Sequence, residues 1–382
     1  MTDLAALDRD DPLALFPDRF ALPDGVIYLD GNSLGPLPRA TRPALDALMA
    51  GAWGRDLIAS WERNGWMAAP LRVGAAIGRL IGAEPNSVIA GDSTSVNLFK
   101  ALAAALSLRP DRDEIAVMEG DFPTDHYIAE GLAGLLGRGH RLRVGPPGPA
   151  SAVMLASHVD FRTGRMRDMA ALTASAHAAG ALSLWDLSHS TGAVPVALEA
   201  AGADFAVGCG YKFLNGGPGA PGFLYVAPRH QGVAPALAGW MGHAAPFAFA
   251  PGYMPAPGIA RFGVGTPPIL GLAALEIGVS LALEADPAAV RAKSLRMSGI
   301  FMAGAAALGG FGCLTPADPA ARGSQVCLTH PDAAGLMRRL AGLGVVGDFR
   351  PPDVMRFGIT PLTLRYRDIG RALACLARAR GE

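Results

Sequence analysis

The sequence predicts an α/β protein in which a largely parallel sheet is covered by helices on both faces. Between residues 87 and 227, short apolar segments alternate with helical stretches of about 10–15 residues. This alternation is typical of parallel sheets, whose crossover helices cover both faces. After about residue 265 the pattern changes to long helical stretches with fewer strands, which predicts a smaller α+β domain at the C-terminal end.

The expected elements follow from where apolar periodicity starts and stops. A short strand should begin at Val26 and run into a polar, glycine-rich turn. In the large domain we expect strands at 87–90, 114–119, 141–145, 152–160, 181–189, 203–210 and 223–227, with helices at 70–82, 96–108, 127–137 and 166–180. In the small domain we expect helices at 269–285, 289–308, 332–342 and up to about Arg380, with strands at 325–330, 345–349 and 354–360. The expected division is an N-terminal segment (1–50), a large domain (51–265) and a small domain (266–382).

Composition excludes several classes of protein. Half of the 382 residues (51%) are hydrophobic, enough for a large core, and a net charge of zero argues against nucleic-acid binding. No apolar run approaches the ~18 residues that a membrane span needs, and the acidic N-terminus does not resemble a signal peptide. The four cysteines have neither the spacing of a zinc site nor that of a disulfide framework. We therefore expect a cytoplasmic protein without a bound metal.

Lysine is rare, and one of the three lysines stands in an unusual position. Lys212 directly follows an apolar strand, within the glycine-rich segment GCGYKFLNGGPGAPGF (208–223). An amine shielded from water is a better nucleophile, and glycines let a backbone approach a ligand closely. Lys100 and Lys293 lie within helical stretches, and we expect both to be ordinary solvated lysines.

Two polar segments follow apolar strands. Thr94 and Ser95 begin a helix, where hydroxyls and backbone N–H groups bind anions, although taken alone they are more simply explained by helix capping. Asp186 ends an apolar strand, where parallel sheets place their ligands, and His189 follows three residues later. Taken alone, this aspartate could belong to a hydrogen-bonded turn.

A third segment, GDFPTDHY (120–127), also follows a strand. It could be only a turn, or Phe122 could stack on a flat cofactor. Together the segments supply an anion site, a carboxylate, an amine and an aromatic ring. Pyridoxal 5′-phosphate (PLP) requires this set, because it binds through a lysine and an acidic partner for its pyridinium nitrogen.

Longer motifs along nearly the whole chain resemble the kynureninase family, which are PLP enzymes of fold type I in the class V aminotransferase group. The motifs are YLDGNSLGPLP, DSTSVNLFK, EGDFPTDHY, WDLSHSTGAVPV, GCGYKFLNGGPGAPGFLYV, GWMGH, GTPPIL and VMRFGITPL. WDLSHSTGAVPV and GYKFLNGGPG, in this order, are specific to that family. The resemblance implies the PLP-dependent transferase fold type I, with a mostly parallel seven-stranded sheet in the large domain and an N-terminal segment that contributes to the active site and the small domain.

The resemblance also implies a role for each site residue. Lys212 would carry PLP as a Schiff base and take the substrate's α-proton, Asp186 would pair with the pyridinium nitrogen, and Tyr211 would bind phosphate and transfer protons. Further cofactor contacts are implied for Thr94, Ser95, Phe122, Pro123, Thr124, Asp125, Ser157 and His189, and, from the partner subunit of a homodimer, for Trp240 and Thr266. Substrate contacts are implied for Arg356, which would clamp the α-carboxylate, and for Trp61, Asn32 and Ser33.

The implied reaction is hydrolytic Cβ–Cγ cleavage of L-kynurenine, 3-hydroxy-L-kynurenine or both, in tryptophan catabolism, which yields anthranilate or 3-hydroxyanthranilate and L-alanine. One departure from the family is Thr363, which stands where an aromatic residue is common. The alternatives are a class V transaminase, a cysteine desulfurase, or a PLP-binding protein without turnover. A desulfurase needs a reactive cysteine on a mobile loop, and no cysteine of this sequence lies in an evident one.

Overall fold

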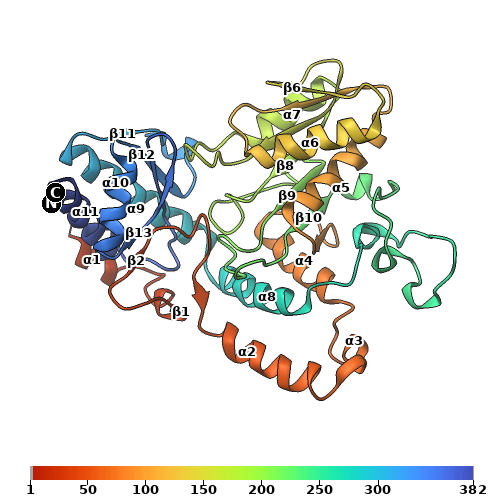
Figure 1. Cartoon of the computed structure of the whole chain (residues 1–382), viewed down its shortest axis with the longest axis horizontal. Coiled ribbons are helices and arrows are strands. Elements are labelled where there is room, and N and C mark those ends of the chain that lie inside the picture. The colour runs from red at the N-terminus through yellow and green to blue at the C-terminus, as the bar shows by residue number, and fades with distance from the viewer. Residues whose placement is uncertain (1–2, 382) are drawn as a thin grey trace.

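A seven-stranded sheet organises the larger part of the computed structural model, which describes residues 3–381 (Figure 1). The strand order is β4-β10-β9-β8-β7-β5-β6, and only β10 runs antiparallel to its neighbours. The strands are β4 (Val88–Ala90), β5 (Glu114–Val117), β6 (Arg141–Val144), β7 (Ser151–Ser157), β8 (Leu182–Asp186), β9 (Phe205–Gly208) and β10 (Phe223–Val226). The predicted, largely parallel α/β sheet is therefore confirmed.

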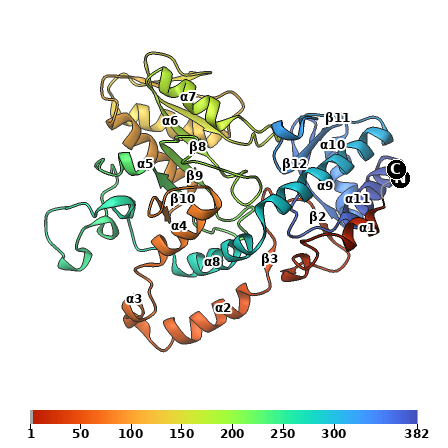
Figure 2. The same cartoon turned by 180° about the vertical axis from the view of Figure 1, so that it is seen from behind.

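Helices cover both faces of this sheet, because successive residues of the buried strands point to opposite sides. Met154 and Ala156 of β7 pack with helices α4 (Ala69–Leu80), α7 (Met169–Ala178) and α8 (Ile269–Glu284). Val153 and Leu155 pack with α5 (Thr94–Ser107) and α6 (Pro123–Leu136) on the other face. Figure 2 shows α4 and α8 lying side by side.

The expected turn at 120–127 is mostly helix, because α6 begins at Pro123. Proline suits the first position of a helix, where its missing N–H is not needed and its φ is already helical. Phe122 is the extended residue before it. The turn is therefore shorter than predicted, and the aromatic ring stands at the start of a helix.

The small domain is built on a second, antiparallel sheet with the order β11-β12-β15-β14. Its strands are β11 (Gly312–Cys313), β12 (Gln325–Thr329), β14 (Asp348–Arg350) and β15 (Val354–Gly358), and its helices are α9 (Pro287–Leu308), α10 (Ala333–Gly342) and α11 (Tyr366–Gly381). The N-terminal segment joins it, since β2 (Ile27–Tyr28) pairs with β13 (Val345–Val346) and α1 (Leu4–Arg9) packs on α11. The domain division stays a prediction, and the packing of α8 on α4 favours a boundary after α8 rather than at residue 265.

The remaining elements connect these bodies. A two-stranded sheet pairs β1 (Phe20–Ala21) with β3 (Leu37–Pro38), and α2 (Thr41–Leu48) and α3 (Ser60–Arg63) form an arm along the lower edge of the molecule in Figure 1. Among residues 3–381, no helix is both long and apolar enough to cross a membrane.

The two lysines expected to be solvated are in fact buried, and that expectation was wrong. The Nζ atom of Lys100 lies 2.8 Å from Asp92 Oδ2, and Nζ of Lys293 lies 2.7 Å from Asp11 Oδ2. Burial lowers the pKa of both lysines, and the paired aspartates oppose that shift. A helical pattern alone does not reveal a buried cation whose partner comes from another segment of the chain.

One buried carboxylate connects several segments near the amino ends of β8 and β9, at the opposite end of the sheet from the carboxyl ends of these strands. Asp204 precedes β9 and accepts hydrogen bonds from Arg229, from the Ser183 N–H, and at 2.7 Å each from the Nε2 atoms of His177 and His230. Burial alone would raise the pKa of Asp204, but these bonds hold it well below its ordinary value. The ionised carboxylate therefore stabilises the folded state.

We expect Asp204→Asn to lower the free energy of unfolding at pH 7 by about 2–3 kcal/mol, because buried donors lose their charged acceptor. Since the folded-state pKa lies below the unfolded one, the carboxylate's contribution is complete above about pH 5 and declines as the pH falls toward the folded pKa. Denaturant unfolding at several pH values should show the stability gap between the wild type and the variant starting to narrow below about pH 5 and still narrowing at about pH 3. The exposed pair Asp46 and Arg42 supplies a control, Asp46→Asn, expected to change stability by less than about 0.5 kcal/mol. An undiminished gap at low pH would contradict the assignment.

Candidate active site

A cavity of about 160 Å³ opens at the carboxyl ends of β7 and β8, between the starts of α5 and α6. This is where open parallel sheets bind their ligands, because the loops that follow the strands meet there. The lining residues are Thr94, Ser95, Leu98, Phe122, Thr124, Asp125, Ser157, Val159, Phe161, Asp186, Ser188, His189, Tyr211 and Lys212. The cavity thus brings together most of the residues for which the sequence predicted cofactor contacts, and Pro123 starts the helix that carries Thr124 and Asp125.

Lys212 reaches into this cavity from the loop between β9 and β10. Its Nζ atom lies 3.0 Å from His189 Nε2, and 6.0 Å from the centre of the Phe122 ring. The loop is held from the N-terminal segment, since the Gly35 N–H donates to the Tyr211 carbonyl at 2.8 Å. A Cβ atom at Gly35 would collide with the carbonyl oxygen of Lys212, so only glycine fits this approach. The N-terminal segment thereby fixes the backbone that carries the amine.

The carboxylates around the amine are almost completely buried. Asp125 is 2% exposed, and its pKa is raised well above the ordinary value by burial and then by the charges of Asp186 and Asp121, whereas Lys212 lowers it. Asp121 has its own cation, because Arg167 Nη1 lies 2.7 Å from it. Asp186 accepts the Ser188 N–H at 2.7 Å. Buried carboxylates need a cationic partner, so the chemistry of this cavity favours a ligand with a protonated nitrogen.

The other end of the cavity suits an anion. Ser93 caps α5 by accepting the Val96 N–H at 3.3 Å, and the first N–H groups of the helix, at Thr94 and Ser95, have no acceptor within the helix. Such a helix start binds phosphate well. Phe122, half exposed at the cavity, offers a ring face. The residues present therefore fit PLP, a flat phosphorylated aldehyde with a ring nitrogen that reacts with an amine.

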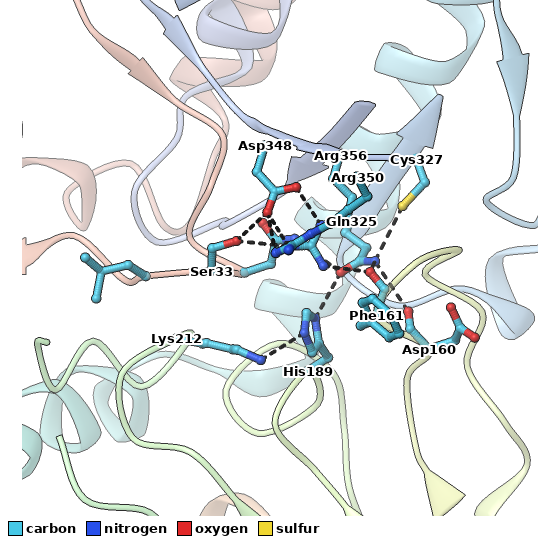
Figure 3. A network of polar contacts seen from close by, with 12 residues as sticks. Ser33, Asp160, Phe161, His189, Lys212, Gln325, Cys327, Asp348, Arg350 and Arg356 are labelled. Atoms are coloured by element: carbon cyan, nitrogen blue, oxygen red, sulfur yellow. Dashed lines mark hydrogen bonds and ion pairs between the residues drawn. The ribbon is translucent and has the colours of Figure 1, made fainter. Parts of the chain in front are cut away.

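Arg356 lies in a second polar cluster, between the small domain and the large one (Figure 3). It is 2% exposed on β15, and Asp348 holds it through two contacts, Nε–Oδ1 at 3.1 Å and Nη2–Oδ2 at 2.6 Å. Its Nη2 also donates to Ser33 Oγ at 2.9 Å, and its Nη1 donates to the Phe161 carbonyl at 2.8 Å. Arg350 bonds the same Asp348 carboxylate at 2.8 Å. The guanidinium is thus fixed in position beside a residue that lines the cavity.

Sequence reasoning missed three members of these clusters. Gln325 bridges His189 and Asn32 through its Oε1 atom, at 3.0 and 3.4 Å, and the Asp348 carboxylate binds both Arg350 and Arg356. No local pattern distinguishes Gln325, the first residue of an apolar strand. The only signal for Asp348 is its place between two glycine- and proline-rich turns, which is weak.

Three predicted residues, Thr266, Trp61 and Trp240, lie away from both the cavity and the Arg356 cluster. Thr266 lines a separate cavity of about 70 Å³ together with Met241. The Trp61 ring contacts the Trp66 and Trp240 rings edge to face, at 5.6 and 6.3 Å between centroids. These residues come from the arm around α3 and from the loop that follows residue 239.

Thr363, at the position where the family commonly has an aromatic residue, is buried and bonded locally. Its hydroxyl lies 2.5 Å from the Thr360 hydroxyl and donates to the Thr360 carbonyl at 3.2 Å. The substitution is therefore accommodated within its own turn, and Arg356 keeps its contacts.

Three of the four cysteines lie in environments that do not favour a nucleophilic thiolate. Cys209 and Cys327 are buried, and burial raises the pKa of both thiols, that of Cys327 to about 12. Burial also raises the pKa of Cys313. A reactive cysteine needs a lowered thiol pKa, so these three environments disfavour a desulfurase.

The fold and the cavity define a PLP-dependent enzyme of fold type I. The structure is similar to cysteine desulfurase CsdA from Escherichia coli, with a TM-score of 0.81 and 19% identity over 97% of this chain and 98% of that one. It is also similar to a variant of C-DES with glycine covalently linked to the PLP cofactor, with a TM-score of 0.80 and 20% identity over 93% and 97% of the two chains. At these identities the likeness establishes the fold alone.

Sequence relatives establish the family. The chain is 50% identical to kynureninase from Deinococcus radiodurans over 399 residues, which covers 100% of this chain and 97% of the relative. It is 45% identical to kynureninase from Pseudomonas fluorescens, over 98% and 94% of the two chains. Residues 290–376 match the family model "Kynureninase C-terminal domain". The chain belongs to the kynureninase family, as its motifs predicted; it is a PLP-dependent hydrolase of a carbon–carbon bond, and the other class V reactions are not favoured.

Proposed function

We propose that this chain hydrolyses the Cβ–Cγ bond of L-kynurenine, 3-hydroxy-L-kynurenine or both, releasing L-alanine and anthranilate or its 3-hydroxy form. The observation that carries the proposal is that the Lys212 amine and the Asp186 carboxylate share one cavity in a chain 50% identical to a kynureninase. We expect the enzyme to act in the cytoplasm, in tryptophan catabolism.

PLP, when bound, supplies an electron sink for the negative charge that develops at the substrate's Cα. Lys212 would carry the cofactor and, as a free amine, remove the Cα proton. Asp186, oriented by the Ser188 N–H, would keep the ring nitrogen protonated. Thr94 and Ser95 would hold the phosphate, and further cofactor contacts would come from Phe122, Pro123, Thr124, Asp125, Ser157 and His189.

Tyr211 is suited to donate a proton. Burial, followed by the charges of Cys209 and Asp186, raises the pKa of Tyr211 to about 12. The phenol therefore keeps its proton at neutral pH. We propose that it protonates Cβ, the carbon that stays on the alanine fragment after Cβ–Cγ cleavage. A positioned acid of this kind contributes about 10²–10⁴-fold to a rate.

Arg356 would bind the substrate α-carboxylate, because a planar guanidinium matches a carboxylate with two parallel hydrogen bonds. Its burial and its four polar contacts support this role, since they restrict the side chain to one orientation before the substrate arrives. Asn32, Ser33 and Trp61 would line the aromatic end of the substrate site.

A homodimer with shared active sites is the arrangement we propose. Trp240 and Thr266 lie outside the cavity of their own chain. The loop between β10 and α8 and the arm formed by α2 and α3 both project from the body (Figure 1). These projections carry exposed apolar side chains, which are typical of protein interfaces. On the arm and the loop they are Trp53, Leu57, Ile58, Phe247, Phe249, Tyr253 and Met254.

The cofactor lysine can be tested directly, because the chain has few lysines. Borohydride reduction of the PLP-loaded enzyme, followed by peptide mass spectrometry, should find the cofactor on Lys212. Lys212→Ala should carry no label and release no fluorescent anthranilate from L-kynurenine. A label on Lys100 or Lys293 would contradict the assignment of the nucleophile, whereas a label on Lys212 without anthranilate from either substrate would contradict the reaction.

Arg356→Lys should lower kcat/KM for L-kynurenine by about 10–100-fold, mainly through a higher KM, because lysine cannot form the paired hydrogen bonds. Steady-state kinetics by anthranilate fluorescence measures this. The matched control is Arg371→Lys, an exposed arginine on α11, which should behave as wild type. An unchanged KM in Arg356→Lys would exclude the carboxylate clamp.

Shared active sites predict complementation between two defective chains. Lys212→Ala and Trp240→Ala should each reduce activity strongly. A mixed dimer of the two variants has one site with both the lysine and the tryptophan intact. Random pairing makes about half of the dimers mixed, so refolding the variants together should restore about a quarter of the wild-type activity, averaged over all dimers. Each variant refolded alone is the control. Mixed dimers that are isolated by two affinity tags and stay inactive would show that each chain completes its own site.

A further inference from the structure

The side chain of Gln325 has only one possible orientation. It is 1% exposed, and it extends from β12 of the small domain to the large domain (Figure 3). Its Nε2 atom lies 2.9 Å from the Phe161 carbonyl oxygen and 3.4 Å from that of Asp160. Carbonyl oxygens only accept hydrogen bonds, so the amide nitrogen must face them and the amide oxygen must face the opposite way.

This orientation determines which nitrogen of His189 carries the proton. The Oε1 atom of Gln325 lies 3.0 Å from His189 Nδ1, and because Oε1 is an acceptor, Nδ1 must be the donor. The His189 side chain is buried. Burial lowers the pKa of His189 well below its ordinary value, and the charges of Lys212, Arg356 and Arg350 act in the same direction, whereas the Gln325 bond opposes them. A neutral ring has only one N–H, so Nε2 is left with a lone pair.

That lone pair faces the reactive amine. His189 Nε2 lies 3.0 Å from Lys212 Nζ, at hydrogen-bond distance. In this tautomer Nε2 accepts an N–H of Lys212 and leaves the lone pair of the free amine available. In the other tautomer the Nε2–H group would face the donors of a protonated amine, or would occupy the lone pair that a free amine needs to act as a base. The hydrogen bond gives the free amine a fixed direction, which a proton transfer at a defined carbon requires.

We propose that Gln325 is a positioning residue that holds His189 in its Nδ1–H tautomer, so that Nε2 can accept a hydrogen bond from Lys212 whenever that amine is free. The inference rests on the proposed reaction, and it assigns a function in that reaction to a residue for which the sequence motifs predicted none. Gln325 acts through His189 and is not itself a catalytic residue.

The same glutamine connects the amine to the substrate clamp. The Phe161 carbonyl that accepts from Gln325 Nε2 also accepts from Arg356 Nη1, at 2.8 Å. A single backbone oxygen therefore orients both the arginine proposed to bind the carboxylate and the amide that sets the histidine tautomer. Gln325 and Arg356 both belong to the small domain, so the packing of this domain against the large one determines the positions of both side chains.

The tautomer can be observed without turnover, by ¹⁵N NMR of histidine-labelled, cofactor-free protein, with the His189 signals assigned by their loss in His189→Gln. The wild type should show a protonated Nδ1 and an unprotonated Nε2. Gln325→Met, which keeps the length of the side chain but removes both amide groups, should move the proton to Nε2. Gln325→Glu retains an acceptor for Nδ1 and should retain the Nδ1 proton.

Gln231 provides a matched control, because it is the only other glutamine of the sequence and its Nε2 also donates to backbone carbonyls, at 3.0 Å to Val226 and 3.3 Å to Asn86. Gln231→Met should leave the His189 signals as in the wild type. A wild-type ring protonated at Nε2 would overturn the proposal, and so would a folded Gln325→Met protein that keeps its Nδ1 proton. If Gln325→Met does not fold, the wild type and Gln325→Glu still test the proposal. The absence of a proton on His189 Nδ1 in either protein would overturn it.

Kinetics then separates positioning from simple structural support. In PLP-loaded Gln325→Met, kcat for L-kynurenine should fall by about tenfold or more, comparable to the loss when a residue that orients a metal-binding histidine is removed, with a smaller change in KM. Gln325→Glu should recover part of the loss, and Gln231→Met should match the wild type. A purely structural role predicts instead a lower melting temperature with unchanged kcat, an outcome that would contradict the positioning role whatever the fate of the substrate assignment.

Discussion

The active site depends on keeping buried carboxylates and a buried amine in one cavity at the ends of two parallel strands. Asp125 lies in the first turn of α6, and Asp186 is the last residue of β8. The large sheet fixes the positions of both elements, so the two carboxylates stay close together. Burial, followed by repulsion from Asp186 and Asp121, raises the pKa of Asp125, and Lys212 offsets this shift only in part. A protonated ring nitrogen would complete the charge balance, so cofactor binding should stabilise the fold as well as enable the chemistry. Because the sheet holds these buried carboxylates together, the site requires a positively charged ligand.

Much of this arrangement was predictable from the sequence, because the parallel sheet converts spacing along the chain into proximity in space. Asp186 ends one apolar strand and Lys212 follows another, and the carboxyl ends of parallel strands meet at one edge. The strand pattern therefore predicted the fold, the polar segments that follow the strands indicated PLP, and the family motifs then indicated the reaction. The error at 120–127 was one of helix boundary, since the turn chemistry of a proline is also the chemistry of a helix start.

The contacts between the two domains could not be predicted in this way. Gln325 meets His189 across 136 positions of sequence, and its own surroundings are those of an ordinary strand. Lys293 and Asp11 present the same difficulty: each looks like a surface residue until the small domain folds the N-terminal segment onto α9. Local periodicity describes faces of helices and strands, and it carries no information about which polar atoms of distant segments meet when those faces pack.

The pairing of Arg356 has a consequence for how the enzyme would select its substrate. The guanidinium already binds Asp348 through two hydrogen bonds, so an incoming α-carboxylate must compete with an internal carboxylate rather than occupy a free cation. The exchange is favourable only when the substrate gains its other contacts at the same time, while Arg350 remains to hold Asp348. A ligand without an α-carboxylate leaves this ion pair intact and gains nothing from it. Selectivity for amino acids would then arise from the difference in free energy between the Arg356–substrate interaction and the Arg356–Asp348 interaction. An unpaired arginine would attract any anion and would not provide this selectivity.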